Sequence, residues 1–184
     1  MLKFDHVGFL VQNADGKREM MEDLLGFDFR YRLVREAADN TNILDFYDYE
    51  GGAIELVQSS NPESMYNRFI REKGEGIHHI AFEVDDLRGT MAEWKEKGVR
   101  FAMDPPLGAS GSRRAIITFT EPESTGGLAI ELCQALAPGE LNPDWVQKPP
   151  SPMVEPAPAE TVPAETVPAE TEPAGAAADL PEPD

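Results

Sequence analysis

An internal duplication constrains the fold of this 184-residue chain more strongly than any other feature. The three histidines all fall at one point of the repeat, and each copy closes with the same Ile-Glu-Leu tripeptide. The first copy runs from Asp5-His6-Val7 to Ile54-Glu55-Leu56, and the second runs from His78-His79-Ile80 to Ile130-Glu131-Leu132. When His6 is aligned with His79, the glutamates follow after 49 and 52 residues. The chain is therefore expected to fold as two equivalent modules.

Both copies predict the same order of elements, βαβββ. Short β-branched and aromatic runs at 4–11 and 77–84 are typical of strands. Each is followed by an amphipathic helical stretch that ends at a glycine, Gly26 or Gly98. Three more strand-like runs follow in each copy, near 27–35, 42–49 and 53–58, then near 99–104, 114–120 and 127–135.

These patterns predict an α+β fold in which two tandem βαβββ modules form a concave, barrel-like mixed sheet with helices outside. The modules cover about residues 2–60 and 76–135, and a linking helix is expected at about 63–73. The folded domain is predicted to span residues 1–136. Residues 137–184 are predicted to form an extended to disordered tail.

The composition of the C-terminal end supports this division. From Pro149 to Asp184 there is no Lys, Arg or aromatic residue, and Pro-Ala-Glu-Thr recurs three times. Such a stretch cannot bury enough apolar surface to offset its chain entropy. Eight acidic residues lie in it, so the formal charge of −18 becomes −10 over residues 1–148.

The remaining charge and the N-terminus narrow the function classes. An acidic domain argues against binding to nucleic acid or to an anionic membrane, because both require a basic surface. No apolar run reaches the length of a membrane span, and Met1-Leu2-Lys3 leads into a strand pattern rather than a signal peptide. The single Cys133 allows no internal disulfide. A cytoplasmic location is predicted.

The duplicated residues predict a metal site. If the modules pack about a pseudo-twofold axis, His6, Glu55, His79 and Glu131 converge on one point. A glutamate flanked by apolar strand residues is costly unless it is paired or binds a metal. A lone histidine is more often a core residue that bonds a backbone carbonyl, but two matched histidines with two matched glutamates favour a divalent ion. This N/O ligand set is compatible with cobalt, nickel, zinc, manganese or iron.

Two neighbouring residues are not expected to be ligands. Adjacent strand residues face opposite ways, so His78 is predicted to point away from His79. Cys133 shares the face of Glu131 by alternation, and we interpret it as a small apolar filler.

The paired units, with a histidine near each start and a glutamate near each end, resemble the vicinal oxygen chelate superfamily. This superfamily includes glyoxalase I, extradiol dioxygenases and methylmalonyl-CoA epimerase. The likeness is greatest to the epimerase branch and covers residues 4–135. It is carried by Asp5-His6-Val7-Gly8, by segments 75–87 and 95–100, and by 124–127 leading into Ile130-Glu131-Leu132. The resemblance implies metal ligands at His6, Glu55, His79 and Glu131, the four residues that the duplication selects.

By the same resemblance, the chain is expected to be a metal-dependent isomerase that removes an α-proton through a metal-stabilised enolate. The substrate would be methylmalonyl-CoA or a related acyl-CoA. Glu131 and Glu55 are predicted to be catalytic bases as well as ligands, and a separate base stays open. Arg113 and Arg114, in a loop that resembles the family's, are candidates for binding a phosphate or carboxylate, or else a solvated strand start. Glu123 replaces a cation usual in epimerases, which disfavours an anionic CoA ester.

Two alternatives stay open. The first is a lactoylglutathione lyase of glyoxalase I type, which isomerises a hemithioacetal through related chemistry on the same ligand set. The second is a non-catalytic ligand-binding protein, although such proteins often lack the complete ligand set. A ring-cleaving dioxygenase is disfavoured, because a second glutamate would occupy a position which that chemistry needs open. A homodimer is compatible with the sequence, because the concave sheets could be completed within one chain or between two.

Overall fold

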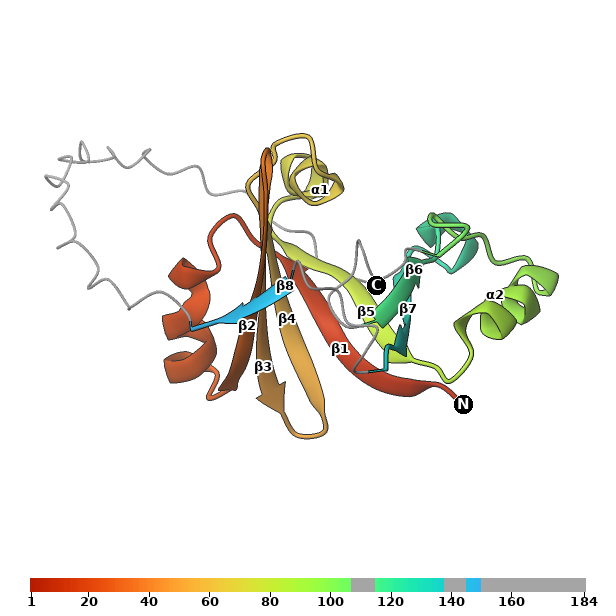
Figure 1. Ribbon diagram of the computed structural model, residues 1–184, viewed down its shortest axis with the longest axis horizontal. Helices are drawn as coiled ribbons and strands as arrows, with labels where there is room; N and C mark the ends of the chain where they lie inside the picture. Colours follow the sequence, from red (N-terminus) through yellow and green to blue (C-terminus); the bar gives the residue numbers. More distant parts are fainter. Residues whose placement is uncertain (107–114, 138–144, 150–184) are drawn as a thin grey trace, which may run out of the picture. The chain divides into compact units, whose positions relative to one another are not determined.

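The structure, a computed structural model, describes residues 1–106, 115–137 and 145–149. One eight-stranded mixed sheet runs through these residues in the order β6-β7-β5-β1-β4-β3-β2-β8 (Figure 1). Its strands are β1 (Lys3–Leu10), β2 (Asp28–Ala37), β3 (Asn40–Tyr49), β4 (Gly52–Ser59), β5 (Gly76–Glu83), β6 (Ala115–Phe119), β7 (Ala129–Ala135) and β8 (Trp145–Lys148).

The strand pairing follows the duplication. β1 pairs with β4 in parallel in the first module, and β5 pairs with β7 in parallel in the second. β1 and β5 pair with each other in antiparallel orientation and so join the modules at the centre of the sheet. The predicted α+β fold with two tandem modules and a mixed sheet is confirmed, and both modules come from one chain.

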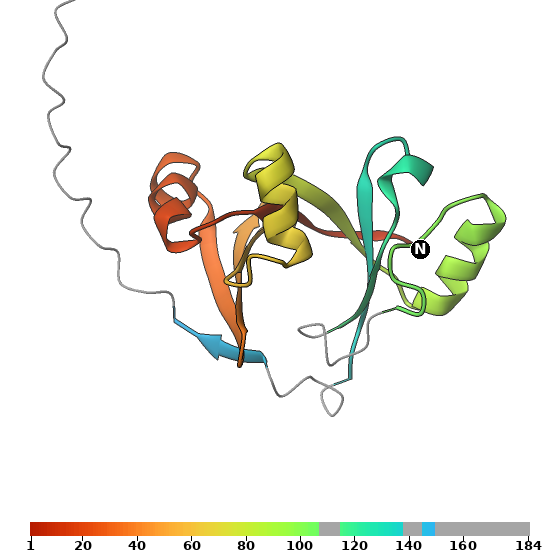
Figure 2. The same ribbon diagram turned by 90° about the horizontal axis from the view of Figure 1, so that it is seen from above.

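Helical segments pack against the sheet in both modules. Figure 2 shows the segments that follow β1 and β5 at opposite ends of it. The five segments are a 3₁₀ turn η1 (Asp15–Lys17), a π-helical turn η2 (Met20–Leu24), α1 (Met65–Lys73), α2 (Leu87–Glu96) and a 3₁₀ turn η3 (Pro122–Ser124). The predicted linking helix is α1. The first module's expected helix is present only as η1 and η2, before Gly26 with a φ of 69°.

A glutamine holds the start of the helical segment in each module. Gln58 Oε1 accepts a hydrogen bond of 2.8 Å from the backbone N–H of Ala14, and Gln134 Oε1 accepts one of 2.9 Å from that of Leu87. Both glutamines stand three residues after a repeated glutamate. The same glutamine-to-backbone hydrogen bond therefore anchors the first residue of the helical segment in both modules.

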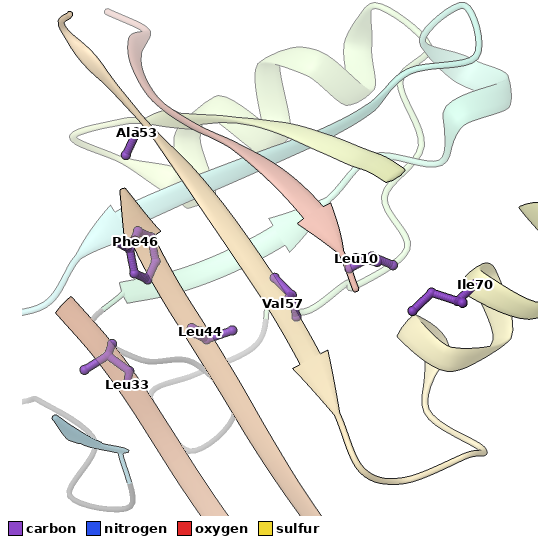
Figure 3. Packing of buried hydrophobic residues seen from close by; sticks show 7 residues of the cluster. All are labelled: Leu10, Leu33, Leu44, Phe46, Ala53, Val57 and Ile70. Atoms are coloured by element: carbon purple, nitrogen blue, oxygen red, sulfur yellow. The ribbon is translucent and has the colours of Figure 1, made fainter. Parts of the chain in front are cut away.

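Apolar residues pack on both faces of the sheet. Figure 3 shows the cluster of the first module on the face that carries Glu55, with side chains from β1 to β4 and from α1. Its members are Leu10, Leu33, Leu44, Phe46, Ala53, Val57 and Ile70. On the other face of the second module, Leu87 and Met91 of α2 pack against Leu132 with Trp94 at their side. Each module thus has its own core.

Two segments differ from the predicted elements. The strand expected near 99–104 forms only an isolated bridge between Phe101 and Thr120. Asp104 is followed by Pro105 and Pro106, which have no N–H to donate, so the ladder cannot continue. The second difference is β8, which pairs with β2 and was not predicted.

The remaining predictions about the chain ends stay open. Residues 150–184, most of the predicted tail, lie outside the described residues. Within the described ranges, no helix has both the length and the apolar character that a membrane span requires. The cytoplasmic location stays a prediction.

Candidate metal centre

Two rows of residues across the sheet build the candidate metal centre. The first row, read across the paired strands, is Phe46, Glu55, Gly8, His79 and Ala129. The second row is Phe119, Glu131, Ala81, His6 and Ala53. Directly paired residues project from the same face of a sheet, so each row has the sequence of types Phe, Glu, small residue, His, Ala. This repeat explains why the four polar side chains reach one point.

The four side chains lie together as the duplication predicts. Nε2 of His6 and Nε2 of His79 are 3.0 Å apart. Nε2 of His6 is 3.1 Å from a carboxylate oxygen of Glu55, and Nε2 of His79 is 3.1 Å from one of Glu131. The two crossed histidine–glutamate distances are both 3.6 Å. The cluster is therefore nearly symmetric about the β1–β5 pair.

The cluster is dry. His6 and His79 are 0% and 1% exposed, and Glu55 and Glu131 are each 4% exposed. The ring of Phe46 lies 5.9 Å from that of His6, and the ring of Phe119 lies 5.1 Å from that of His79. Electrostatic interactions are strong in such surroundings because little water screens them.

Burial and mutual charge shift the pKa values of the cluster. Burial alone would lower the pKa of His6, but the charge of Glu55 and hydrogen bonds to carboxylates raise it from 6.5 to about 11. The pKa of His79 is also raised, because hydrogen bonds to the two glutamates outweigh its burial. Burial alone would raise the pKa of Glu131, but hydrogen bonds from His6 and His79 lower it to about 2. The buried carboxylates thus stabilise the protonated, positively charged forms of His6 and His79.

These properties fit a divalent ion. Two imidazole nitrogens 3.0 Å apart between two carboxylates require a cation, either a proton or a metal ion, in their midst. The four ligand atoms lie within 4.8 Å of one another. An ion bound at about 2.1 Å from each ligand atom would separate neighbouring ligand atoms by about 3 Å. The donor set and its spacing therefore suit an ion with N/O ligands.

His78 differs from the prediction. The register of β1 against β5 shifts so that His78 is an extra residue between the pairs Gly8–His79 and Phe9–Ile77. Such a β-bulge breaks the alternation of side chains. The Nδ1 atoms of His78 and His79 are 3.0 Å apart, so the prediction that His78 points away from His79 is wrong. The sequence contains no signal for a bulge at this position.

A cavity of about 160 Å³ lies on the same face of the sheet. Asp5 and Glu83 lie along it, with Phe46 and three alanines, Ala53, Ala115 and Ala135. Cys133 also lines this cavity and packs in the apolar cluster of Ala115, Ile117 and Phe119. Arg113 and Arg114, the candidate substrate-binding residues, lie outside the described residues.

Comparisons with known proteins agree with this architecture. The uncharacterized protein YqjC of Bacillus subtilis is 29% identical over 136 residues, which is 73% of this chain and 93% of YqjC. The ethylmalonyl-CoA/methylmalonyl-CoA epimerase of Cereibacter sphaeroides is 25% identical over 135 residues, or 72% of this chain and 97% of that protein. A solved methylmalonyl-CoA epimerase in complex with methylmalonyl-CoA and NH4+ has a TM-score of 0.63 and 26% identity, and the match covers 74% of this chain and 96% of that one.

The family assignment rests on a match to a family model. The model of the glyoxalase/bleomycin resistance protein/dioxygenase superfamily matches residues 5–117. This range includes most of β1, all of β2 to β5 and the residues His6, Glu55 and His79. That range is more than half of the chain and agrees with the resemblance seen in the sequence. This chain belongs to the glyoxalase/bleomycin resistance protein/dioxygenase superfamily.

Proposed function

We propose that this protein is a metal-dependent epimerase of an acyl-CoA, with methylmalonyl-CoA as the first substrate to test. The observation that carries the proposal is the pair of buried carboxylates, Glu55 and Glu131, at equivalent positions on the two sides of His6 and His79. Relatives named as methylmalonyl-CoA epimerases match more than seven-tenths of the chain, which supports the same class of reaction.

The two glutamates suit an inversion at carbon. Epimerisation requires a base that removes a proton from one face of a carbon and an acid that returns a proton to the other face. We assign both roles to Glu55 and Glu131, each of which also serves as a ligand. One carboxylate would take the α-proton, and the other, once it has bound a proton, would deliver that proton to the opposite face. This step requires a higher carboxyl pKa in the substrate complex than the value of about 2 that Glu131 has beside the protonated histidines. A divalent ion held by the cluster would supply a Lewis acid for the substrate carbonyl and for the enolate.

The cavity beside the cluster suits a small acyl group. Three alanines line it, and their short side chains leave room where larger residues would fill it. Arg30 also lines this cavity, where it forms an ion pair of 3.5 Å with Asp48. We therefore place the acyl part of the substrate here. Arg113 and Arg114 stay predicted candidates for binding a phosphate or a carboxylate.

Exchange of the α-hydrogen tests the proposal. Each single isomer of methylmalonyl-CoA is incubated in deuterated water with cobalt-loaded protein and with metal-free protein, and deuterium at the α-carbon is followed by mass spectrometry. Cobalt-dependent inversion with one deuterium incorporated is expected. If fully loaded protein gives no exchange, the epimerase proposal is contradicted, and the hemithioacetal of methylglyoxal and glutathione is the next substrate to test.

Two matched variants test the roles of the glutamates. Glu131→Gln and Glu55→Gln each keep an oxygen that can bind the ion but remove one base. Inversion is expected to fall by at least about 100-fold in each, the lower end of the range for general acid–base catalysis. Each variant should still exchange the α-hydrogen of one isomer without inverting it, and the two variants should differ in which isomer that is. Glu93→Gln, on the exposed face of α2 where Glu93 pairs with Lys97, is the control and should behave as wild type.

A further inference from the structure

The residue before each ligand histidine occupies a β-bulge. On β1, Asp5 is the extra residue between the pairs Phe4–Phe82 and His6–Ala81. On β5, His78 is the extra residue between the pairs Phe9–Ile77 and Gly8–His79. Asp5 and His78 are equivalent under the duplication, so the two bulges are also equivalent. A bulge re-aims side chains, and here it turns both residues toward the histidine that follows.

The contact in the first module is charged. Oδ2 of Asp5 lies 2.6 Å from Nδ1 of His6. Nδ1 is the ring nitrogen that does not face the cluster, because Nε2 of His6 lies near Glu55 and Glu131. A carboxylate can only accept a hydrogen bond, so Nδ1 of His6 carries a proton and donates it. The side chain of Asp5 is 35% exposed and lies along the cavity.

The contact in the second module is made by a partly buried imidazole. The ring of His78 lies 5.0 Å from that of Phe69 and 6.4 Å from that of Tyr66, both on α1. The ring of Phe119 is 5.8 Å away. This aromatic surround, supplied by the linking helix and β6, holds Nδ1 of His78 at 3.0 Å from Nδ1 of His79.

We propose that Asp5 and His78 are positioning residues that each accept a hydrogen bond from Nδ1 of the following histidine and so direct Nε2 of His6 and His79 to the metal ion. This inference rests on the metal centre of the proposed function. For His79 to present the lone pair of Nε2, its Nδ1 must carry the proton. His78 must then accept through a bare Nδ1, which places its own proton on Nε2.

The two positioning residues are chemically unequal. Asp5 is an anion, whereas His78 acts as a neutral acceptor. A hydrogen bond to a carboxylate makes an imidazole a stronger donor to a metal than a bond to a neutral group does. The bulges therefore make a nearly symmetric cluster electronically unsymmetric, with His6 the stronger ligand.

Cobalt affinity tests the role of each residue. His78→Leu removes the acceptor and keeps an apolar side chain among the aromatic rings, whereas His78→Asn keeps an oxygen near the place of Nδ1. His78→Leu is expected to weaken cobalt binding by about 10–100-fold, the usual effect of losing such a partner, while His78→Asn stays near wild type. Asp5→Asn, which keeps the acceptor but loses the charge, should weaken binding and shift the cobalt absorption spectrum.

A second measurement does not depend on any variant. Nitrogen-15 NMR of the zinc-loaded wild-type protein should show protons on Nδ1 of His6 and of His79, and on Nε2 of His78. A proton on Nδ1 of His78 would overturn the inference. So would unchanged cobalt affinity and spectrum in both His78→Leu and Asp5→Asn while the wild type binds cobalt. If the wild type itself binds no cobalt, the metal centre of the proposed function is contradicted as well.

Discussion

At the scale of single residues, the absence of a side chain at position 8 is what lets His79 reach the cluster. A Cβ atom at Gly8 would lie 2.0 Å from Cε1 and 2.3 Å from Nε2 of His79. In the other row the residue at this position is Ala81, so the two halves tolerate different sizes beneath their histidines. Gly8 therefore belongs to the candidate centre, although it carries no functional group.

We expect Gly8→Ala to push the His79 ring out of position. Cobalt affinity should fall by about tenfold or more, because ligand orientation controls metal affinity. Overpacking at this buried site should also destabilise the protein by ~1–3 kcal/mol. Competition with a chelator and thermal unfolding measure the two effects. The mirrored variant Ala81→Gly creates no clash and should bind cobalt nearly as wild type does. If Gly8→Ala bound cobalt as tightly as the wild type, the His79 ring would have to reach the ion from a different position, which would contradict the prediction.

The charge of His6 predicts how metal binding depends on pH. In the metal-free fold its pKa is about 11 instead of 6.5, so His6 is protonated at pH 8. Its stabilising effect on the metal-free fold is complete below pH 6.5 and is lost as the pH rises through about 11. A metal ion must displace that proton, so cobalt affinity should still rise with pH at pH 8, by about tenfold per unit for each proton released. Calorimetry in two buffers with different ionisation enthalpies measures the protons released. Zero release at pH 8 would contradict the shifted pKa.

At the scale of elements, the duplication made most strands and the four ligand candidates predictable. Alternation within β4 and β7 put Glu55 and Glu131 on one face, and equivalence of the modules brought them to His6 and His79. Gly26 ends the first helical segment with a positive φ, as expected of a glycine at a helix C-terminus. The alternation of side chains within strands and the internal duplication were therefore sufficient to predict these strands and the four candidate ligands.

The elements that escaped prediction depend on tertiary context. A bulge adds one residue to one strand and leaves no mark in composition, so the placement of His78 beside His79 could not be read from alternation. β8 forms because β2 offers a free edge, which is a property of the assembled sheet. The segment near 99–104 has strand propensity and forms the bridge of Phe101 with Thr120, but Pro105 and Pro106 directly after it have no N–H with which to extend the ladder.

At the scale of the whole molecule, the candidate centre connects the two modules. Each module supplies one histidine and one glutamate, and β1 and β5 meet directly beneath them. The four side chains come from a single chain, so the centre does not need a second copy for its completion. A homodimer stays a prediction. Without an ion, two buried carboxylates and two buried imidazoles must be stabilised by protons alone.

A metal ion should therefore stabilise both modules together. At a cobalt concentration 100 times its dissociation constant, binding to the folded state alone adds ~2.7 kcal/mol. For a domain of this size that corresponds to a rise of roughly 5–10 °C in the unfolding midpoint. Thermal unfolding followed by circular dichroism, over a series of cobalt concentrations, should show one cooperative transition that moves upward and returns when a chelator is added. His79→Ala, which removes a ligand from the second module, should abolish the shift of this single transition. A midpoint independent of cobalt would contradict a shared metal centre.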